Sequence, residues 1–335
     1  MAVNWHYIPN CCFNCMKIAL TIPGFSAHGG INVILEWANR LSEFHEVTLI
    51  TSKLGKHQWY PLEKAVKVTT DIYLKKYDCL IICSPHHSFL LESKHLPEKC
   101  FVFMQMLEDK FKPHDIAWQR ACKAFYNAKY PMFYISEWNY SEIKRSNDQD
   151  VYLGNGVNFD LFPLETPEKE NVILVEGWEP SNPTKDVDYV GAKVAKELKK
   201  LYGCKVLAYS QLPCKEYMEV PDEYHVKPNL ETLNSLYRRA KIFIKATKCD
   251  ARSTAPLEAA TKQCVVVRGI DRGDDDLDVS NCYKTDYNFQ HVLNSAKFAC
   301  ENYLHGILKA QELQRNIVQF DWPYYMGIVN EEISK

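Results

Sequence analysis

The chain has 335 residues, 46% of them hydrophobic, which is enough for about two domains with separate cores. Its 40 lysines and arginines nearly balance its 42 aspartates and glutamates, so the composition argues against a surface built to bind nucleic acid or an anionic membrane. No apolar run approaches the length of a transmembrane helix, and the longest, at 79–84 and 100–107, are strand-sized.

Residues 1–15 are predicted to be an extension ahead of the fold. They have no apolar stretch after a charged start, so they do not resemble a secretory signal. A zinc site formed by His6, Cys11, Cys12 and Cys15 stays open as an alternative, although its spacing fits no common ligand pattern. The thirteen cysteines are scattered, and several lie in strand-like runs, which indicates reduced thiols rather than a secreted disulfide framework. We therefore expect a cytoplasmic location.

From Met16 onward, predicted strands alternate with predicted helices. Residues 16–22 form a strand, 23–30 a glycine-bearing loop, 31–44 an amphipathic helix and 45–52 a second strand. Further buried strands follow at 77–84, 100–106, 132–136 and 151–157. Such βαβ units favour a parallel sheet.

The pattern breaks at 162–171, where proline and charged residues indicate a linker, and then restarts. Strands are predicted at 172–178, 204–210 and 241–247, and helices at 186–202 and 229–240. The region from about 296 to 320 is predicted to be helical. The chain therefore consists of two α/β halves of about equal size.

The stretch at 241–269 is predicted to run strand, tight turn, helix, strand. Asp250 ends the first strand, and Glu258 is placed in the first turn of the helix. The small residues Ser253, Thr254 and Ala255 lie between them, where free N–H groups at a helix start attract anions such as phosphate. Both carboxylates can face one ligand at the C-terminal edge of the sheet. The alternative is an ordinary βαβ unit with two solvated acids.

Four segments, in order along the chain, carry a family likeness. They are 16–51 with its Gly29–Gly30 loop, "YLGNGVNFDLFP" at 152–163, "DARSTAPLE" at 250–258 and "FDW" at 320–322. Together they resemble the family 4 glycosyltransferases, retaining enzymes of the GT-B fold, and the overall texture adds the hypothesis of a virus-encoded member.

The resemblance spans about residues 16–335 and implies an α/β protein with two Rossmann-like domains, whose parallel sheets face each other across a cleft. Residues 16–163 are the expected acceptor domain, 168–320 the nucleotide-sugar donor domain, and 321–335 are expected to pack back on the first.

The chain departs from the family pattern at three positions. Asp250 replaces the usual first glutamate, Trp178 follows Gly177 where an arginine is usual, and Cys83 occupies a common histidine position. His86 and His87 follow Cys83 in the same loop, and Arg252 is a candidate for the missing positive charge.

The resemblance also implies a role for each candidate residue. Asp250, Lys185 and His86 form the expected catalytic set: Asp250 orients the transferred sugar, Lys185 neutralises the leaving diphosphate, and His86 contacts sugar or acceptor. The expected donor-binding residues are Gly29, Gly30, Gly177, Arg252, Ser253, Thr254, Ala255 and Glu258, with Glu258 on the ribose hydroxyls. The alternatives are a tight turn at the glycines, a solvated Lys185 and a structural His86.

The implied reaction is the retaining transfer of a hexose from a nucleotide sugar to a glycan or another hydroxyl acceptor, with no cofactor and no metal. GDP-mannose is favoured over UDP-glucose, although no residue proves it. The aspartates at 271–278 are interpreted as a solvated loop, with a calcium site as the alternative.

Three other functions stay open. One is a non-catalytic nucleotide-sugar-binding partner subunit, and another is a sugar-nucleotide epimerase. The third is an NAD-dependent oxidoreductase, although the loop at 23–30 lacks the G-x-G-x-x-G spacing. The acceptor, the linkage and the oligomeric state are undetermined, with a homodimer among the options.

Overall fold

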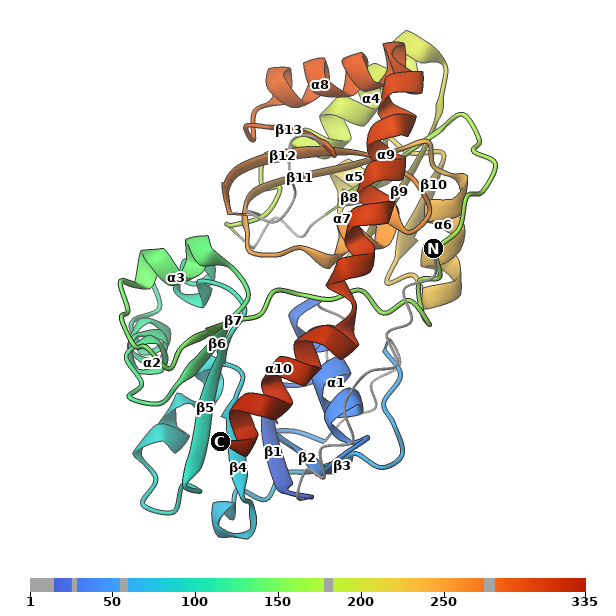
Figure 1. Cartoon of the computed structure of the whole chain (residues 1–335). Coiled ribbons are helices and arrows are strands. Elements are labelled where there is room, and N and C mark those ends of the chain that lie inside the picture. Colours follow the sequence, from blue (N-terminus) through green and yellow to red (C-terminus); the bar gives the residue numbers. More distant parts are fainter. Residues whose placement is uncertain (1–14, 26–28, 55–59, 178–182, 274–280) are drawn as a thin grey trace.

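The computed structural model describes residues 15–25, 29–54, 60–177, 183–273 and 281–335. Within these ranges the chain forms two parallel sheets, one in each half, with helices packed on them (Figure 1). None of the helices in the described ranges is long and apolar enough to cross a membrane. His6, Cys11, Cys12, Trp178 and most of the aspartate run at 271–278 lie outside the described residues.

The first sheet has seven strands in the order β3-β2-β1-β4-β5-β6-β7. Their bounds are β1 (Lys17–Ile22), β2 (Glu46–Thr51), β3 (Lys67–Thr69), β4 (Cys79–Ile82), β5 (Lys99–Met104), β6 (Met132–Tyr134) and β7 (Val151–Tyr152). The helices of this half are α1 (Gly29–Leu41), α2 (Ile116–Tyr126) and α3 (Glu137–Ile143). The strand order reverses between β1 and β4, which is where open parallel sheets bind ligands.

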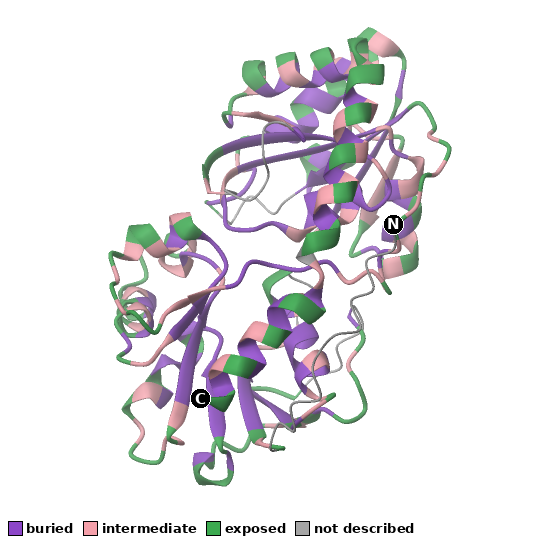
Figure 2. Cartoon of the chain, viewed as in Figure 1, coloured by how far each residue is buried: buried purple, intermediate pink, exposed green. Residues whose placement is uncertain are grey.

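The second sheet repeats this topology with the order β10-β9-β8-β11-β12-β13. Its strands are β8 (Val172–Gly177), β9 (Lys205–Ser210), β10 (Glu223–Val226), β11 (Ile242–Asp250), β12 (Val265–Gly273) and β13 (Tyr283–Thr285). Its helices are α4 (Val190–Tyr202), α5 (Lys215–Met218), α6 (Leu230–Arg239), α7 (Thr254–Ala260), α8 (Phe289–Glu301) and α9 (Tyr303–Ile317). The central strands are buried on both faces (Figure 2), which explains their continuous apolar runs.

The last helix, α10 (Trp322–Ser334), returns to the first half of the chain (Figure 1). Trp322, Met326 and Val329 share one apolar cluster with β1 and α1. Just before α10, Asp321 forms a parallel bridge with Val157, so the two chain crossings between the halves lie side by side.

The structure contains elements that the sequence patterns did not predict. Strands β3, β10 and β13 lie at or near sheet edges and are three or four residues long, so they lack the long apolar runs of the central strands. Helices α2 and α3 also went unpredicted. Glu258 lies in the second turn of α7 rather than the first, because the helix already begins at Thr254.

Candidate active site

A cavity of about 570 Å³ lies between the two halves of the molecule, at the C-terminal ends of the central strands of both sheets. Its size suits a small-molecule ligand. The cavity is lined by ten of the eleven residues proposed from the sequence: Gly29, Gly30, His86, Lys185, Asp250, Arg252, Ser253, Thr254, Ala255 and Glu258. The fold therefore brings together residues that are more than 200 positions apart in the chain.

Gly177 is the exception, because it is not among the residues that line this cavity. A Cβ atom added at Gly177 would lie 2.8 Å from the ring of Tyr217. Gly177 has a packing role, because a side chain here would collide with the buried tyrosine ring at the end of β8. Its contact with the donor stays a prediction.

Two helix starts face each other across the cavity. Helix α1 begins at Gly29, and a Cβ atom added there would lie 3.9 Å from Oγ1 of Thr254, where α7 begins. A Cβ atom added at Gly30 would lie 3.2 Å from the amide oxygen of Gln105. Both glycines are exposed and line the cavity, so the backbone at the start of α1 is accessible to a ligand.

The second domain contributes a buried network of charges. Nζ of Lys185 lies 3.2 Å from Oδ1 of Asp250, and Nζ of Lys245 lies 3.5 Å from Oδ2 of the same carboxylate. Lys245 also lies 2.6 Å from Oε2 of Glu176 and donates a 2.7 Å hydrogen bond to Oγ of Ser253. Burial by itself would raise the pKa of Asp250, but Lys185, Lys245 and the buried Arg268 outweigh it and hold that pKa well below its usual range.

Sequence patterns missed Lys245 and Glu176 as site residues. The predicted strand at 241–247, "KIFIKAT", alternates apolar and polar residues as a half-buried strand does, and Lys245 occupies a polar position, which by itself indicates a solvent-facing side chain. In the structure Lys245 is 2% exposed, because its side chain ends among carboxylates at the floor of the cavity. The alternation correctly predicted the strand. It did not distinguish a polar side chain that faces solvent from one that faces the floor of a cavity, because both give the same alternating pattern.

Glu258 lies on α7, near the Glu176 and Lys245 end of the charge network. Burial raises the pKa of its carboxyl to about 7, and the nearby Glu176 carboxylate adds to the shift. The hydroxyl of Tyr237 donates a 3.4 Å hydrogen bond to its Oε2. Near neutral pH this carboxyl is therefore close to half protonated, so it can both donate and accept hydrogen bonds.

The first domain supplies a different wall, centred on His86. The Ser84 hydroxyl lies 3.0 Å from Nδ1 of His86 and 3.5 Å from Oε2 of Glu108, and the Trp118 ring lies 4.5 Å from the imidazole. Burial raises the pKa of Glu108 to about 8, and burial together with Lys112 lowers the pKa of His86. Both groups are therefore largely neutral at pH 7. The sequence offered no signal for Glu108 or Trp118 beyond their position after a strand.

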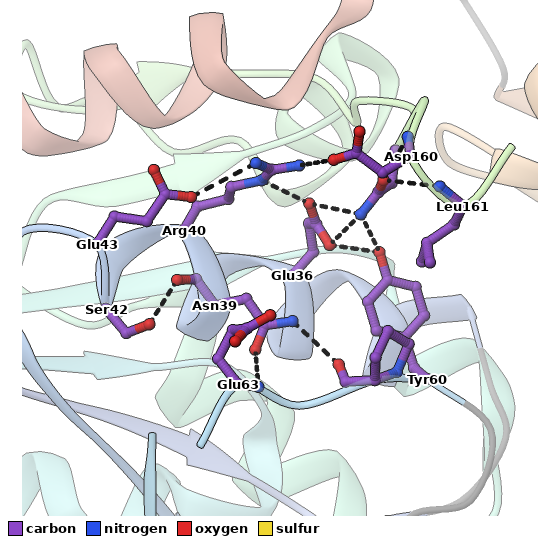
Figure 3. Close-up of polar contacts among 11 residues, drawn as sticks. Glu36, Asn39, Arg40, Ser42, Glu43, Tyr60, Glu63, Asp160 and Leu161 are labelled. Atoms are coloured by element: carbon purple, nitrogen blue, oxygen red, sulfur yellow. Dashed lines mark hydrogen bonds and ion pairs between the residues drawn. The ribbon is translucent and has the colours of Figure 1, made fainter. Parts of the chain in front are cut away.

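Helix α1 also forms hydrogen bonds with Asn158, near the start of the segment that connects the two domains. Figure 3 shows Glu36 of α1 with Arg40 and Tyr60. Nε of Arg40 lies 2.9 Å from Oε1 of Glu36, and the Tyr60 hydroxyl donates to Oε2. Nδ2 of Asn158 donates to both carboxylate oxygens at 3.1 and 3.0 Å. Through Glu36, helix α1 is therefore hydrogen-bonded to Asn158, in the segment that leads into the second domain.

Comparisons with known proteins give matches in structure only. No protein-family model matches the chain, and no curated protein sequence matches it. Solved structures with the same two-domain α/β fold are numerous.

One of them is HepE (Alr3699) of Anabaena, crystallised with UDP and glucose and also with UDP-glucose. It superposes with a TM-score of 0.72 at 12% identity, over 95% of this chain and 99% of HepE. Sucrose-phosphate synthase of Thermosynechococcus elongatus superposes with a TM-score of 0.73 at 11% identity, over 94% of this chain and 97% of the synthase. WaaG, a glycosyltransferase of lipopolysaccharide biosynthesis, superposes with a TM-score of 0.69 at 11% identity, over 94% of this chain and 99% of WaaG. At these identities the likeness establishes the GT-B fold that the sequence predicted.

Proposed function

We propose that this protein is a glycosyltransferase that moves a hexose from a nucleotide sugar to a hydroxyl group of a glycan or a similar acceptor. The observation that carries the proposal is the interdomain cavity, in which the start of α1 faces buried lysines and carboxylates of the second domain. The structural likeness to HepE, which was crystallised with UDP-glucose, supports the same conclusion.

The diphosphate of the donor is assigned to the space between the start of α1 and the two lysines. Free N–H groups at the start of a 13-residue helix attract an anion, and Gly29 and Gly30 leave them accessible. Lys185 and Lys245 supply fixed positive charge from the opposite side. These groups stabilise the negative charge that develops on the departing nucleoside diphosphate more strongly than the charge of the bound donor, which lowers the barrier to transfer.

The two ends of the donor are assigned from the strand order. Asp250 and Lys185 lie at the β11 side of the cavity, whereas Gln211, Leu230 and Leu233 lie at the β9 side. Strands β9 and β11 are separated by β8, so their ends are about 10 Å apart, roughly the distance from a nucleobase to the far phosphate. The base is placed at the amide and apolar end, and the transferred sugar near Asp250.

The acceptor is assigned to the wall of the first domain. His86 and Glu108 offer hydrogen-bonding groups beside the Trp118 indole, and Nζ of Lys112 lies 5.2 Å from the centroid of that ring. Such a surface suits a molecule that carries hydroxyl groups. Independence of metal ions is part of this proposal, since the fixed lysines already provide charge at the diphosphate. Retention of anomeric configuration is part of it because the family resemblance implies it.

The experiment is calorimetry with UDP-glucose, GDP-mannose and an ADP-sugar, followed by a transfer assay with the donor that binds. UDP-glucose is tested first because of HepE, and GDP-mannose second because the sequence favoured it. Donor binding followed by sugar transfer supports the proposal. Binding without turnover on any acceptor indicates a nucleotide-sugar-binding subunit. Binding of NADH but of none of the nucleotide sugars contradicts it.

A further inference from the structure

The loop at 251–253, between β11 and α7, belongs to the second domain in sequence but packs into the first. Ala251 is buried in the same apolar cluster as β1, α1 and α10. Nδ2 of Asn155 donates a buried 2.7 Å hydrogen bond to the backbone carbonyl of Arg252. The loop that presents Ser253 to the cavity is therefore attached through its backbone to the opposite domain.

The side chain of Arg252 extends the same attachment. It is 4% exposed, and its Nη1 donates a 3.2 Å hydrogen bond to the hydroxyl of Tyr152. The guanidinium carbon lies 5.7 Å from the ring centroid of Tyr325 on α10, a cation–π arrangement. These aromatic partners both belong to the first half of the fold.

Gly154 leaves the space that the guanidinium of Arg252 occupies. It has a φ of +79°, a backbone conformation that favours glycine, and a Cβ atom added there would lie 1.9 Å from Nη1 of Arg252. Any larger residue at this position would push the guanidinium out of the site. Three residues of the "YLGNG" sequence in the first domain, Tyr152, Gly154 and Asn155, thus accommodate Arg252 of the second domain.

We propose that Arg252 is a positioning residue that holds the two domains closed, rather than a direct ligand of the donor phosphate. Its guanidinium hydrogen-bonds Tyr152 and lies over the Tyr325 ring at the same time, which a lysine at this position does not reproduce. Its effect on the donor is indirect: closure sets the position of Asp250 and Ser253 opposite α1. That effect rests on the proposed function, whereas the effect on domain arrangement does not.

This role predicts a particular pattern of affinity losses. Loss of the attachment lowers the closed population, and every ligand that needs closure loses apparent affinity by that same factor. The diphosphate is placed against α1 of the first domain and needs closure, whereas the nucleoside is placed on second-domain residues and does not. Loss of the attachment should therefore weaken the diphosphate, whichever partner of the attachment is changed. A direct phosphate role of Arg252 would instead confine the loss to the Arg252 variants, because Tyr325 is not among the residues that line the cavity.

The test uses small-angle X-ray scattering of the full chain without ligand, beside calorimetry with UDP, uridine, GDP and guanosine. The variants are Arg252→Met, Arg252→Lys, Tyr325→Leu and Tyr325→Phe. Arg239→Met is the matched control, because Arg239 lies in the second domain and pairs with Glu223 at 2.8 Å, on an edge strand of the second sheet. Arg252→Lys and Tyr325→Phe keep the charge and the ring respectively, so they cover the case in which a larger change prevents folding.

Arg252→Met and Tyr325→Leu are both expected to increase the radius of gyration and to weaken the nucleoside diphosphates by about tenfold, or about 1.4 kcal/mol, with little change for the nucleosides. Arg252→Lys should be intermediate, and Tyr325→Phe and Arg239→Met close to wild type. An unchanged radius of gyration in Arg252→Met, with diphosphate affinity lost in Arg252→Met but not in Tyr325→Leu, overturns the inference and makes Arg252 a phosphate ligand. If no nucleotide binds even the wild type, the proposed function fails, and the scattering data still decide the role of Arg252.

Discussion

Asp250 is the residue at which the structure changes the expected result of a mutation. The resemblance assigns it to the transferred sugar, so Asp250→Asn should slow transfer and leave the affinity for free nucleotide nearly unchanged. The structure shows its carboxylate between Lys185 and Lys245, at 3.2 and 3.5 Å. Its negative charge therefore opposes the cations that are proposed to hold the diphosphate.

The size of the effect follows from these distances. At an effective dielectric constant of about 20, the gross attraction across the 3.2 Å contact is about 5 kcal/mol. Desolvation offsets much of this, and removing one partner of a buried pair typically costs about 3–5 kcal/mol. Asparagine keeps a hydrogen-bonding oxygen for Lys185, so we expect a loss near the lower end, about 3 kcal/mol, and a Tm lower by about 6–12 °C.

Nucleotide binding should change in the opposite direction. A phosphate bound to the lysines would lie about 6 Å from the Asp250 carboxylate, where repulsion amounts to about 2.8 kcal/mol before screening. Asp250→Asn should therefore bind free nucleoside diphosphate at least about tenfold more tightly, while its transfer rate falls because the sugar contact is weakened.

The assays are thermal denaturation, calorimetry with free nucleotide and initial transfer rates. The matched control is Asp188→Asn, because the Asp188–Lys248 pair is exposed and contributes little. The lowered pKa of Asp250 means that its stabilisation is present above about pH 4, the pKa of an unfolded aspartate, and is lost below it. The Tm difference from wild type should therefore be full at pH 6–8 and shrink in acid. Wild-type Tm together with unchanged or weaker nucleotide affinity would refute this account of the charge network.

Four further predictions concern the site. Glu258→Gln should weaken free nucleoside diphosphate and nucleotide sugar by the same factor in calorimetry, since both contain the ribose; a loss confined to the nucleotide sugar would move Glu258 to the transferred hexose. The pKa of Glu258, raised to about 7, means that ionisation destabilises the folded protein as pH rises from about 4 to 7, so Glu258→Gln should raise the Tm at pH 8 and leave it nearly unchanged at pH 4. Lys185→Ala should weaken donor binding by at least about tenfold, because it removes a charge-assisted contact to the diphosphate, and unchanged affinity would limit Lys185 to its pair with Asp250. Transfer should persist in EDTA because the lysines supply the fixed charge; complete loss that is restored by Mg²⁺ or Mn²⁺ would contradict the mechanism.

Much of this protein could be predicted from local sequence patterns. The central strands and the helices α1, α4 and α6 have apolar periodicities that determine their type, because a buried parallel strand and an amphipathic helix each need one such pattern. The break at 162–171 separated the two halves. Small residues near Asp250 and the paired glycines at the start of α1 indicated where an anion could approach the backbone.

Tertiary structure alone decided which charges meet. Lys245 has the pattern of an exposed strand residue, yet it is buried between Glu176 and Asp250. Arg252 has the sequence position of a phosphate ligand, yet its side chain contacts Tyr152 and Tyr325 of the other domain. Periodicity reports which side chains leave bulk water, but it does not report the partner of a buried charge. Strand order within the second sheet brings Glu176 to Lys245, and the docking of the two domains brings Tyr152 and Tyr325 to Arg252. These partners are more than 60 positions apart, so no local pattern records the contact.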